Sequence, residues 1–147
     1  MDKKVLYDLS YGLYAIGVKD EKRNCGCIVN TVFQITNNDP LIAVSMNKEN
    51  YTYELIKRNN RFSVSILSED TAAKVINKLG FVSGKDHDKW DEFKYEEWQG
   101  LPIVKDHAMG HMVCEVTTMV EKEIKFEQSL RITNWDRPSD TITATSP

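Results

Sequence analysis

Residues 25–36 read CGCIVNTVFQIT, an apolar and β-branched run that is interrupted by polar side chains. This composition predicts a strand over Cys25 to Ile35. Residues 11–19, YGLYAIGVK, have the same character, and the charged segment 20–24 between the two runs is typical of a turn. We therefore expect the two runs to form a β-hairpin.

Turn-forming residues and a second apolar run follow this hairpin. Residues 37–40, NNDP, predict a turn, because proline restricts the residue before it and Asn and Asp side chains stabilise turns. Residues 41–46, LIAVSM, then predict a short buried strand. Thr52 is suited to cap the N-terminus of a short helix over residues 53–57.

The middle of the chain alternates between strand and helix signals. Residues 62–66, FSVSI, have the two-residue period of a half-buried strand. Apolar residues between positions 72 and 79 recur at helical spacing, and Gly80 is expected to end that helix. Residues 81–100 are polar and predict a long loop with one helical turn at most, whereas residues 112–120 predict another strand.

The order of strands, then helices, then strands predicts a mainly β, antiparallel barrel with two or three peripheral helices. A chain of 147 residues is the length of one domain, and we place that domain at residues 1–133. The segment 134–147 is rich in Thr, Ser, Asp and Pro and has few apolar residues. We expect it to be a poorly ordered polar tail.

Charge and hydropathy exclude two classes of partner. The net charge is −3 and basic residues are scattered among acidic ones, so the chain lacks the concentrated basic surface that nucleic acid requires. No apolar run approaches the roughly 20 residues of a membrane helix. The N-terminus leads straight into periodic sequence without a signal-peptide core, which favours a cytoplasmic protein.

The positions of the cysteines and histidines bear on two possibilities, a disulfide and a metal site. Cys25 and Cys27 would lie side by side on one face of a strand, which indicates reduced thiols and not a disulfide framework. His107, His111 and Cys114 have an H-x3-H-x2-C spacing that could bind zinc on a helix. The surrounding residues predict a strand and no fourth ligand is near, so we expect loop histidines, a buried cysteine and no metal. Phosphate-loop, nucleophile-elbow and G-x-G-x-x-G motifs are also absent from the sequence.

Two polar clusters remain as candidate ligand-binding positions. Asn30, Thr31 and Gln34 interrupt an apolar strand, and an amide-rich ligand would satisfy their hydrogen-bonding groups. The alternative is that they face solvent or pair across the sheet. Residues 45–52, SMNKENYT, join a predicted core strand to a helix start, and hydroxyls, a lysine and backbone N–H groups together suit a phosphate.

Several separated segments also resemble one known family, the flavin-reductase-like FMN-binding proteins. More narrowly, they are similar to the flavoredoxins and to the flavin domain of high-molecular-weight rubredoxins. The resemblance covers roughly residues 5 to 120 and rests on 9–14 (LSYGLY), 26–36 (GCIVNTVFQIT), 40–52 (PLIAVSMNKENYT), 81–86 (FVSGKD), 88–89 (DK) and 100–102 (GLP).

The resemblance implies a split β-barrel that forms a homodimer, with one FMN near each subunit interface. The residues expected to line the isoalloxazine ring are Asn30, Thr31, Val32 and Gln34. Those expected to hold the ribityl chain and the phosphate are Ser45, Asn47, Lys48, Tyr51 and Thr52. Those expected to close over the flavin from a loop are Ser83, Gly84, Lys85 and Lys89.

The activity that the resemblance implies is that of an oxidoreductase. NAD(P)H would reduce the bound FMN, and free flavin or a rubredoxin-type protein would accept the electrons. No side chain is required as a catalytic group, and Cys27 is interpreted as a small buried hydrophobe and not as a redox thiol. Two alternatives stay open: an FMN electron carrier without reductase activity, and a barrel that binds another ligand or serves as an interaction module.

The C-terminal part departs from the family pattern. After Glu121 the chain reads KEIKFEQS, without the Gly-Thr-His-Thr-Leu-Phe-like segment that lies near the flavin in the family. We therefore expect a truncated or divergent C-terminus in which closing strands are missing or replaced. This departure affects nicotinamide binding more than FMN binding, because the expected phosphate contacts lie earlier in the chain.

Overall fold

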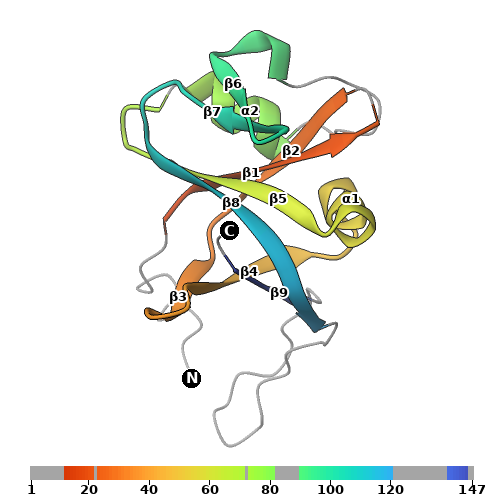
Figure 1. The fold of residues 1–147 in the computed structure, drawn as a ribbon. Coiled ribbons are helices and arrows are strands. Elements are labelled where there is room, and N and C mark those ends of the chain that lie inside the picture. Colours follow the sequence, from red (N-terminus) through yellow and green to blue (C-terminus); the bar gives the residue numbers. More distant parts are fainter. Residues whose placement is uncertain (1–11, 22, 72, 82–89, 121–138, 146–147) are drawn as a thin grey trace, which may run out of the picture.

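The computed structural model describes residues 12–21, 23–71, 73–81, 90–120 and 139–145 (Figure 1). Along the chain the elements are β1 (Tyr14–Asp20), β2 (Arg23–Val29), β3 (Val32–Thr36), β4 (Leu41–Asn47), α1 (Tyr51–Asn59), β5 (Arg61–Leu67), α2 (Ala73–Phe81), the 3-10 helix η2 (Trp90–Glu92), β6 (Tyr95–Trp98), β7 (Leu101–Val104), β8 (Ala108–Val120) and β9 (Ser139–Thr145). The expectation of a mainly β, antiparallel protein with peripheral helices is confirmed. Of the helices described, none is long and apolar enough to cross a membrane.

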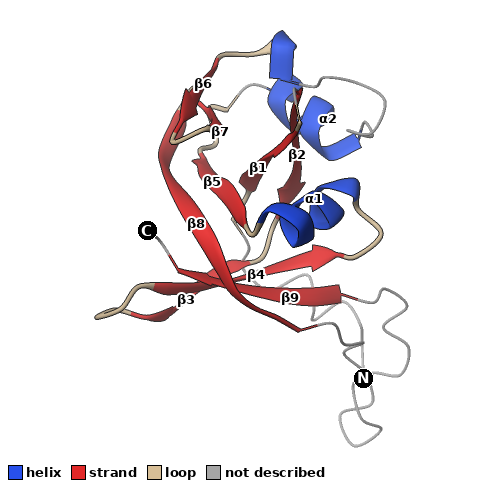
Figure 2. Ribbon diagram, turned by 45° about the vertical axis from the view of Figure 1, so that its right-hand side comes forward, coloured by secondary structure: helices blue, strands red, loops and turns tan. Residues whose placement is uncertain are grey.

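One large sheet has the strand order β2-β1-β5-β8-β9-β4-β3, with antiparallel pairing throughout. Its two edge strands, β2 and β3, are consecutive in the sequence and are joined only by Asn30 and Thr31. Because two residues cannot span the width of a flat sheet of this size, the sheet must curve until its edges approach each other. Figure 2 shows this curvature, with β8 running from the group of β1, β2 and β5 to the group of β3, β4 and β9.

The predicted hairpin is confirmed, but its second strand is shorter than expected. β1 pairs with β2 in register from Tyr14 opposite Val29 to Asp20 opposite Arg23. The expected strand over Cys25 to Ile35 is divided into β2 and β3. The division is necessary because β2 pairs with β1 while β3 pairs with β4 on the opposite edge of the sheet.

β5 is buried on both faces, so the expectation of a half-buried strand was wrong. Ser63 and Ser65 are both fully buried. The two-stranded sheet of β6 and β7 covers them: the Ser63 hydroxyl donates to the carbonyl of Pro102, and the Ser65 hydroxyl accepts from the backbone N–H of Val104 at 3.0 Å. Hydrogen bonds to a second sheet thus replace the contacts with water that the alternation predicted.

The expected long loop over residues 81–100 also contains ordered core structure. Trp90 is fully buried in a cluster with Phe93, Val75 and Leu79, and its ring lies 5.2 Å from that of Phe93. β6 begins at Tyr95, within the same segment. The polar composition concealed these elements, because only a few large side chains fix them to the core.

α1 begins two residues earlier than expected and has a different cap. Asn50, not Thr52, is the N-cap residue, and its side-chain oxygen accepts from the backbone N–H of Thr52 at 3.0 Å. Thr52 lies inside the first turn and is 1% exposed. Asparagine stabilises an N-cap position as well as threonine does or better, so the residue type alone does not distinguish Asn50 from Thr52. In the folded chain Asn50 takes the N-cap position.

The segment expected to be a poorly ordered tail contributes a strand. β9 (dark blue in Figure 1) pairs with β4 along its whole length, from Leu41 opposite Thr145 to Asn47 opposite Ser139, and it also pairs with β8. The sequence of β9, SDTITAT, has few apolar residues, which led to the expectation of disorder. β-branched threonines and backbone pairing on both sides favour a strand in spite of that composition. The segment that replaces the family's Gly-Thr-His-Thr-Leu-Phe-like residues lies outside the described residues.

Candidate functional site

The junction of β2 and β3 lies beside the C-terminal half of β4. The backbone N–H of Ser45 donates to the carbonyl of Thr31 at 3.0 Å. Asn30 is exposed, and the Thr31 hydroxyl donates to its side-chain oxygen at 3.1 Å. Val32 continues the pairing opposite Val44. The fold therefore brings Asn30, Thr31 and Ser45, which come from both candidate clusters, to one place on the sheet.

The turn between β4 and α1 is organised by Asn47. Its side-chain oxygen accepts from the N–H of Glu49 at 2.9 Å, and its carbonyl accepts from the N–H of Asn50 at 3.0 Å. Lys48 is exposed within this turn, immediately before the N-terminus of α1. Lys48 and the positive end of the helix dipole favour an anion at this turn, whereas Glu49 beside Lys48 and Glu54 in the first turn of α1 oppose it.

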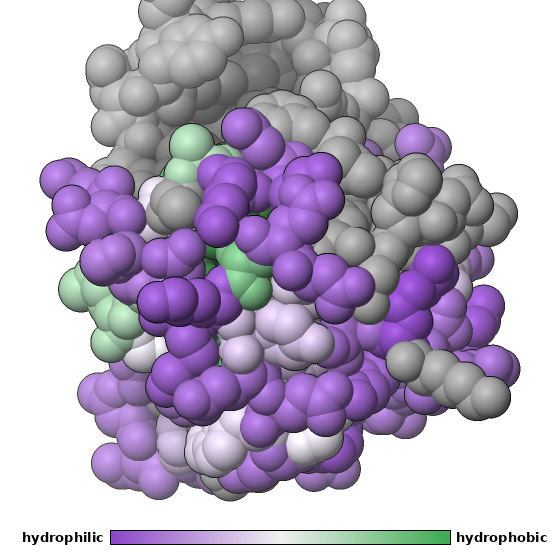
Figure 3. Space-filling model, turned by 90° about the horizontal axis from the view of Figure 1, so that it is seen from above, coloured by the Kyte–Doolittle hydropathy of each residue, from purple (hydrophilic) through white to green (hydrophobic). Residues whose placement is uncertain are grey.

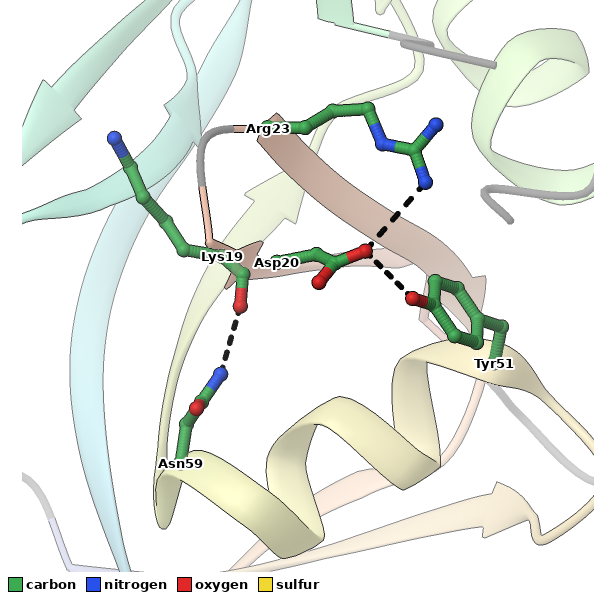
Figure 4. Close-up of polar contacts among 5 residues, drawn as sticks. All are labelled: Lys19, Asp20, Arg23, Tyr51 and Asn59. Atoms are coloured by element: carbon green, nitrogen blue, oxygen red, sulfur yellow. Dashed lines mark hydrogen bonds and ion pairs between the residues drawn. The ribbon is translucent and has the colours of Figure 1, made fainter. Parts of the chain in front are cut away.

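Tyr51, the first residue of α1, is held by residues of the β1–β2 hairpin (Figure 4). Its hydroxyl donates to Oδ2 of Asp20 at 2.6 Å, and a guanidinium nitrogen of Arg23 lies 3.5 Å from the same oxygen. The hydrogen bond to Asp20, together with partial burial and the charge of the carboxylate, raises the pKa of Tyr51 above its usual value. The tyrosine therefore stays neutral, with its proton directed to Asp20.

Two of the expected contact residues are engaged elsewhere in the chain. Thr52 is buried, and its backbone N–H is already bound by Asn50. The amide nitrogen of Gln34 donates to the carbonyl of Thr36 at 3.0 Å and to the side chain of Asn37 at 2.7 Å. The Thr52 side chain is buried and the Gln34 amide has partners within the chain, so their expected contacts with a ligand stay predictions. Ser83, Gly84, Lys85 and Lys89 lie outside the described residues.

A surface hollow at the β3–β4 turn is a separate feature. It is lined by Thr36, Asn37, Asn38, Asp39 and Leu41. Leu41 and Asn47 are the two ends of β4. At about 3.3 Å per residue, Leu41 lies about 13 Å along this strand from Ser45 and about 20 Å from Asn47 in the polar turn. The hollow is therefore distinct from the cluster around Thr31 and Ser45.

The H-x3-H-x2-C residues do not converge. His111 and Cys114 are three positions apart on β8, so their side chains point to opposite faces of the strand. The ring of His111 lies 4.7 Å from that of Trp98, whereas Cys114 is fully buried in the core. Within the described part of the chain, no group of three potential ligands is placed to hold a metal ion.

The three cysteines are buried and form no disulfide with one another. Cys25, Cys27 and Cys114 all belong to the larger core cluster. Cys27 is 3% exposed, so its interpretation as a buried hydrophobe agrees with its position. Burial raises the pKa of the Cys114 thiol to about 12, which keeps it protonated at neutral pH.

Sequence reasoning missed Asp20 and Arg23, which it placed in a charged turn. Asp20 and Tyr51 are 31 positions apart, and a local pattern carries no signal for a pair at this separation. The contact exists because α1 lies beside the end of β1, which brings the Tyr51 hydroxyl to Asp20.

The comparison with known proteins agrees with this geometry. A family model described as "Flavin reductase like domain" matches residues 6–126. The chain belongs to this family. High molecular weight rubredoxin of Moorella thermoacetica is 39% identical over 122 residues, which are 82% of this chain and 53% of that protein. The chain thus spans about half the length of that relative.

A second relative and a solved structure are also similar to this flavin-reductase-like protein. The ferric-chelate reductase (NAD(P)H) of Archaeoglobus fulgidus is 38% identical over 117 residues, which are 79% of this chain and 69% of that one. The crystal structure of an FMN-binding protein from Thermus thermophilus with bound p-hydroxybenzaldehyde superposes with a TM-score of 0.74. It is 21% identical, and the match covers 96% of this chain and 72% of that one, which establishes the shared fold. Family membership supports a flavin as the cofactor and an oxidoreductase as the class of protein.

Proposed function

We propose that this protein binds FMN and passes electrons from NAD(P)H, through the bound flavin, to free flavin or to a rubredoxin-type protein acceptor. The observation that supports this most directly is the contact between Thr31 and Ser45. This contact joins the polar junction of β2 and β3 to β4. The exposed Lys48 and the start of α1 follow the end of β4 at Asn47. A ligand with a polar ring at one end and a phosphate at the other matches this arrangement.

The chemistry of the residues fits such a ligand. Asn30, Thr31 and Ser45 offer amide, hydroxyl and backbone groups of the kind that recognise the edge of a flavin ring and its ribityl chain. Asn47 and Lys48 offer an amide and a cation for the phosphate beside a helix N-terminus. A bound flavin would supply hydride acceptance from a nicotinamide and onward electron transfer, while the protein binds and orients it.

Three parts of the proposal extend beyond the described site. Asn30 and Thr31 join the two edges of the large sheet, which supports a split barrel closed near this junction. Ser83, Gly84, Lys85 and Lys89 are proposed to close over the flavin. Val32, Gln34 and Thr52 complete the proposed set of residues that contact the cofactor, and Tyr51 belongs to the same site through its place at the start of α1.

We also propose a homodimer that uses the edge strand β3. Phe33 and Ile35 of the edge strand β3 are 54% and 47% exposed, and Ile35 lies at a β-bulge in the pairing with β4. Large exposed apolar side chains on an edge strand favour association with another chain. The opposite end of the molecule, around β6, β7 and α2, presents a mainly hydrophilic surface in the part described (Figure 3). Light scattering coupled to size-exclusion chromatography should give twice the mass of one chain.

The function is tested by spectroscopy and by nicotinamide oxidation. Protein incubated with FMN and freed of excess ligand should show flavin absorption bands, and it should oxidise NADH or NADPH when free flavin is added. Protein that retains no flavin after this treatment would refute the proposal.

A second candidate, an FMN electron carrier, is favoured by the 39% identity with a high molecular weight rubredoxin. A carrier would retain FMN but oxidise neither NADH nor NADPH without a separate reductase. The two candidates therefore differ in the kinetic measurement and agree in the spectrum.

A further inference from the structure

Helix α1 is attached to the end of β1 at both of its own ends. At the N-terminal end, the Tyr51 hydroxyl donates to Asp20 at 2.6 Å. At the C-terminal end, the side-chain nitrogen of Asn59 donates to the carbonyl of Lys19 at 2.7 Å. Lys19 and Asp20 are consecutive residues at the end of β1, so one short segment of the hairpin accepts hydrogen bonds from both ends of α1 (Figure 4).

The N-terminal attachment lies next to the proposed phosphate turn. Tyr51 is the first residue of α1 and comes three positions after Lys48. A hydrogen bond at the first helical residue restrains the orientation of the N-terminal turn, and with it the direction in which the helix dipole and the preceding turn point. The attachment at Asn59 is eight residues away, which is about 12 Å along the helix axis.

A carboxylate near an anion site would ordinarily weaken the binding of the anion. A guanidinium nitrogen of Arg23 lies 3.5 Å from the Asp20 oxygen that accepts the hydrogen bond from Tyr51. The side chains of Arg23 and Asp20 are both partly exposed. The guanidinium therefore offsets the charge of the carboxylate locally. The cluster of Asp20, Arg23 and Tyr51 holds the helix start without adding net negative charge.

We propose that Asp20 and Tyr51 are positioning residues for the phosphate end of the flavin site, and that Arg23 keeps the field there favourable to an anion. Tyr51 then acts by orienting the first turn of α1. Its hydroxyl does not donate a hydrogen bond to the ligand, because it donates one to Asp20. This inference rests on the proposed function, since it concerns how the same site selects a phosphorylated flavin.

FMN and riboflavin provide the discriminating pair of ligands, because they share the ring and the ribityl chain and differ in the phosphate. We define the selectivity as the Kd of riboflavin divided by the Kd of FMN, with both constants measured by flavin fluorescence titration of the full chain. Loss of a positioning residue should reduce the selectivity and leave the Kd of riboflavin unchanged. A general loss of structure would raise both dissociation constants together.

The test compares four variants with the unmodified protein. Tyr51→Phe removes the hydrogen bond without changing a charge and should reduce the selectivity by about fivefold to tenfold, the scale of one hydrogen bond. Asp20→Ala also removes the hydrogen bond, but it removes a carboxylate near the anion as well, so its selectivity should fall by less. Asp20→Asn keeps an oxygen acceptor for the tyrosine and removes a negative charge near the anion, so it should retain or raise the selectivity. Asn59→Ala removes the attachment at the far end of the same helix and should leave the selectivity unchanged.

Arg23 is tested by the salt dependence of FMN binding. Arg23→Gln leaves the Asp20 charge without its offset, so the Kd of FMN should rise by a larger factor in low salt than in 0.5 M salt, where the repulsion is screened. Arg23→Lys restores a positive charge and should restore the salt dependence of the unmodified protein.

The outcomes separate this inference from the function on which it rests. If the unmodified protein binds FMN no better than riboflavin, the proposed phosphate site is wrong. If the unmodified protein is selective and Tyr51→Phe keeps that selectivity, the positioning role is wrong and the phosphate site stands. A reduction of the same size in Asn59→Ala would also overturn the positioning role, because general docking of the helix would then be the cause.

Discussion

Lys48 is an exposed cation in the turn that leads into α1, and this position makes it the residue on which phosphate binding should depend most. Replacing Lys48 by alanine should weaken FMN binding by about 1–3 kcal/mol, the range of a charge-assisted hydrogen bond. Fluorescence titration measures the change. Lys74→Ala, which removes an exposed lysine from α2, is the matched control and should bind FMN normally. Equal affinities in the two variants would place the phosphate elsewhere.

Cys114 illustrates how burial alone controls the chemistry of a residue. Its thiol is fully buried on β8 opposite Phe62, and burial raises its pKa to about 12. In the unfolded chain the pKa of cysteine is about 8.5, so between these two values unfolding releases a proton. The native state therefore loses stability as the pH rises above about 8.5, and the group contributes no pH dependence below that value.

This pH dependence is measurable by urea unfolding at pH 7.5 and pH 9.5. The unmodified protein should lose about 1 kcal/mol more of its unfolding free energy between these two values than Cys114→Ala does. Cys114→Ala is less stable at both values because of the lost packing, so only the difference between the two pH values is compared. An identical pH dependence in both proteins would show that the thiol ionises as readily in the folded chain as in the unfolded one.

Among the elements, β5 shows how a second sheet alters the environment of a strand. The Ser65 hydroxyl accepts from the backbone N–H of Val104 on β7, and both residues are buried. Ser65→Ala leaves that N–H buried without an acceptor, which should reduce the unfolding free energy by about 1–3 kcal/mol. Ser68→Ala is the control: its hydroxyl donates to the carbonyl of His107 at a solvent-exposed position, where water replaces the bond. A smaller loss in Ser65→Ala than in Ser68→Ala would contradict this account of how β7 is held.

At the scale of the whole molecule, β9 connects the two halves of the large sheet. β8 pairs with β5 through its N-terminal part and with β9 through its C-terminal part, and β9 in turn pairs with β4. In the strand order, β9 is the neighbour through which β4 and β3 are joined to the remaining strands. The surface that unites Thr31, Ser45 and Lys48 therefore depends on a strand near the C-terminus of the chain.

A truncation tests this dependence. Ending the chain at Pro138 removes β9 and should reduce the unfolding free energy by about 3 kcal/mol or more, because two ladders of backbone hydrogen bonds are lost. Ending it at Thr145 removes only the last two residues and should unfold like the complete chain. Urea unfolding followed by circular dichroism measures both. Equal stability of the two truncated chains would show that β4 and β8 do not require β9.

Local sequence patterns predicted the elements whose environment follows from their own residues. The β1–β2 hairpin, the strand over residues 41–46 and the strand over 112–120 were expected because strand propensity and turn residues act within a few positions. The same patterns failed at Ser63 and Ser65, at Trp90 and in β9. In each of these cases the deciding partner lies on a segment distant in the sequence.

The candidate site divides in the same way. The sequence by itself determined which residue types could meet a flavin, and it determined the family, because polar residues in an apolar strand and a lysine before a helix are local features. Tertiary structure alone decided that Thr31 lies against Ser45, that Asn50 takes the cap position while Thr52 is buried, and that Asp20 holds Tyr51. The physical reason is that a hydrogen bond across the sheet, or from a helix to a hairpin, depends on how the whole chain is packed, and no window of neighbouring residues contains that information.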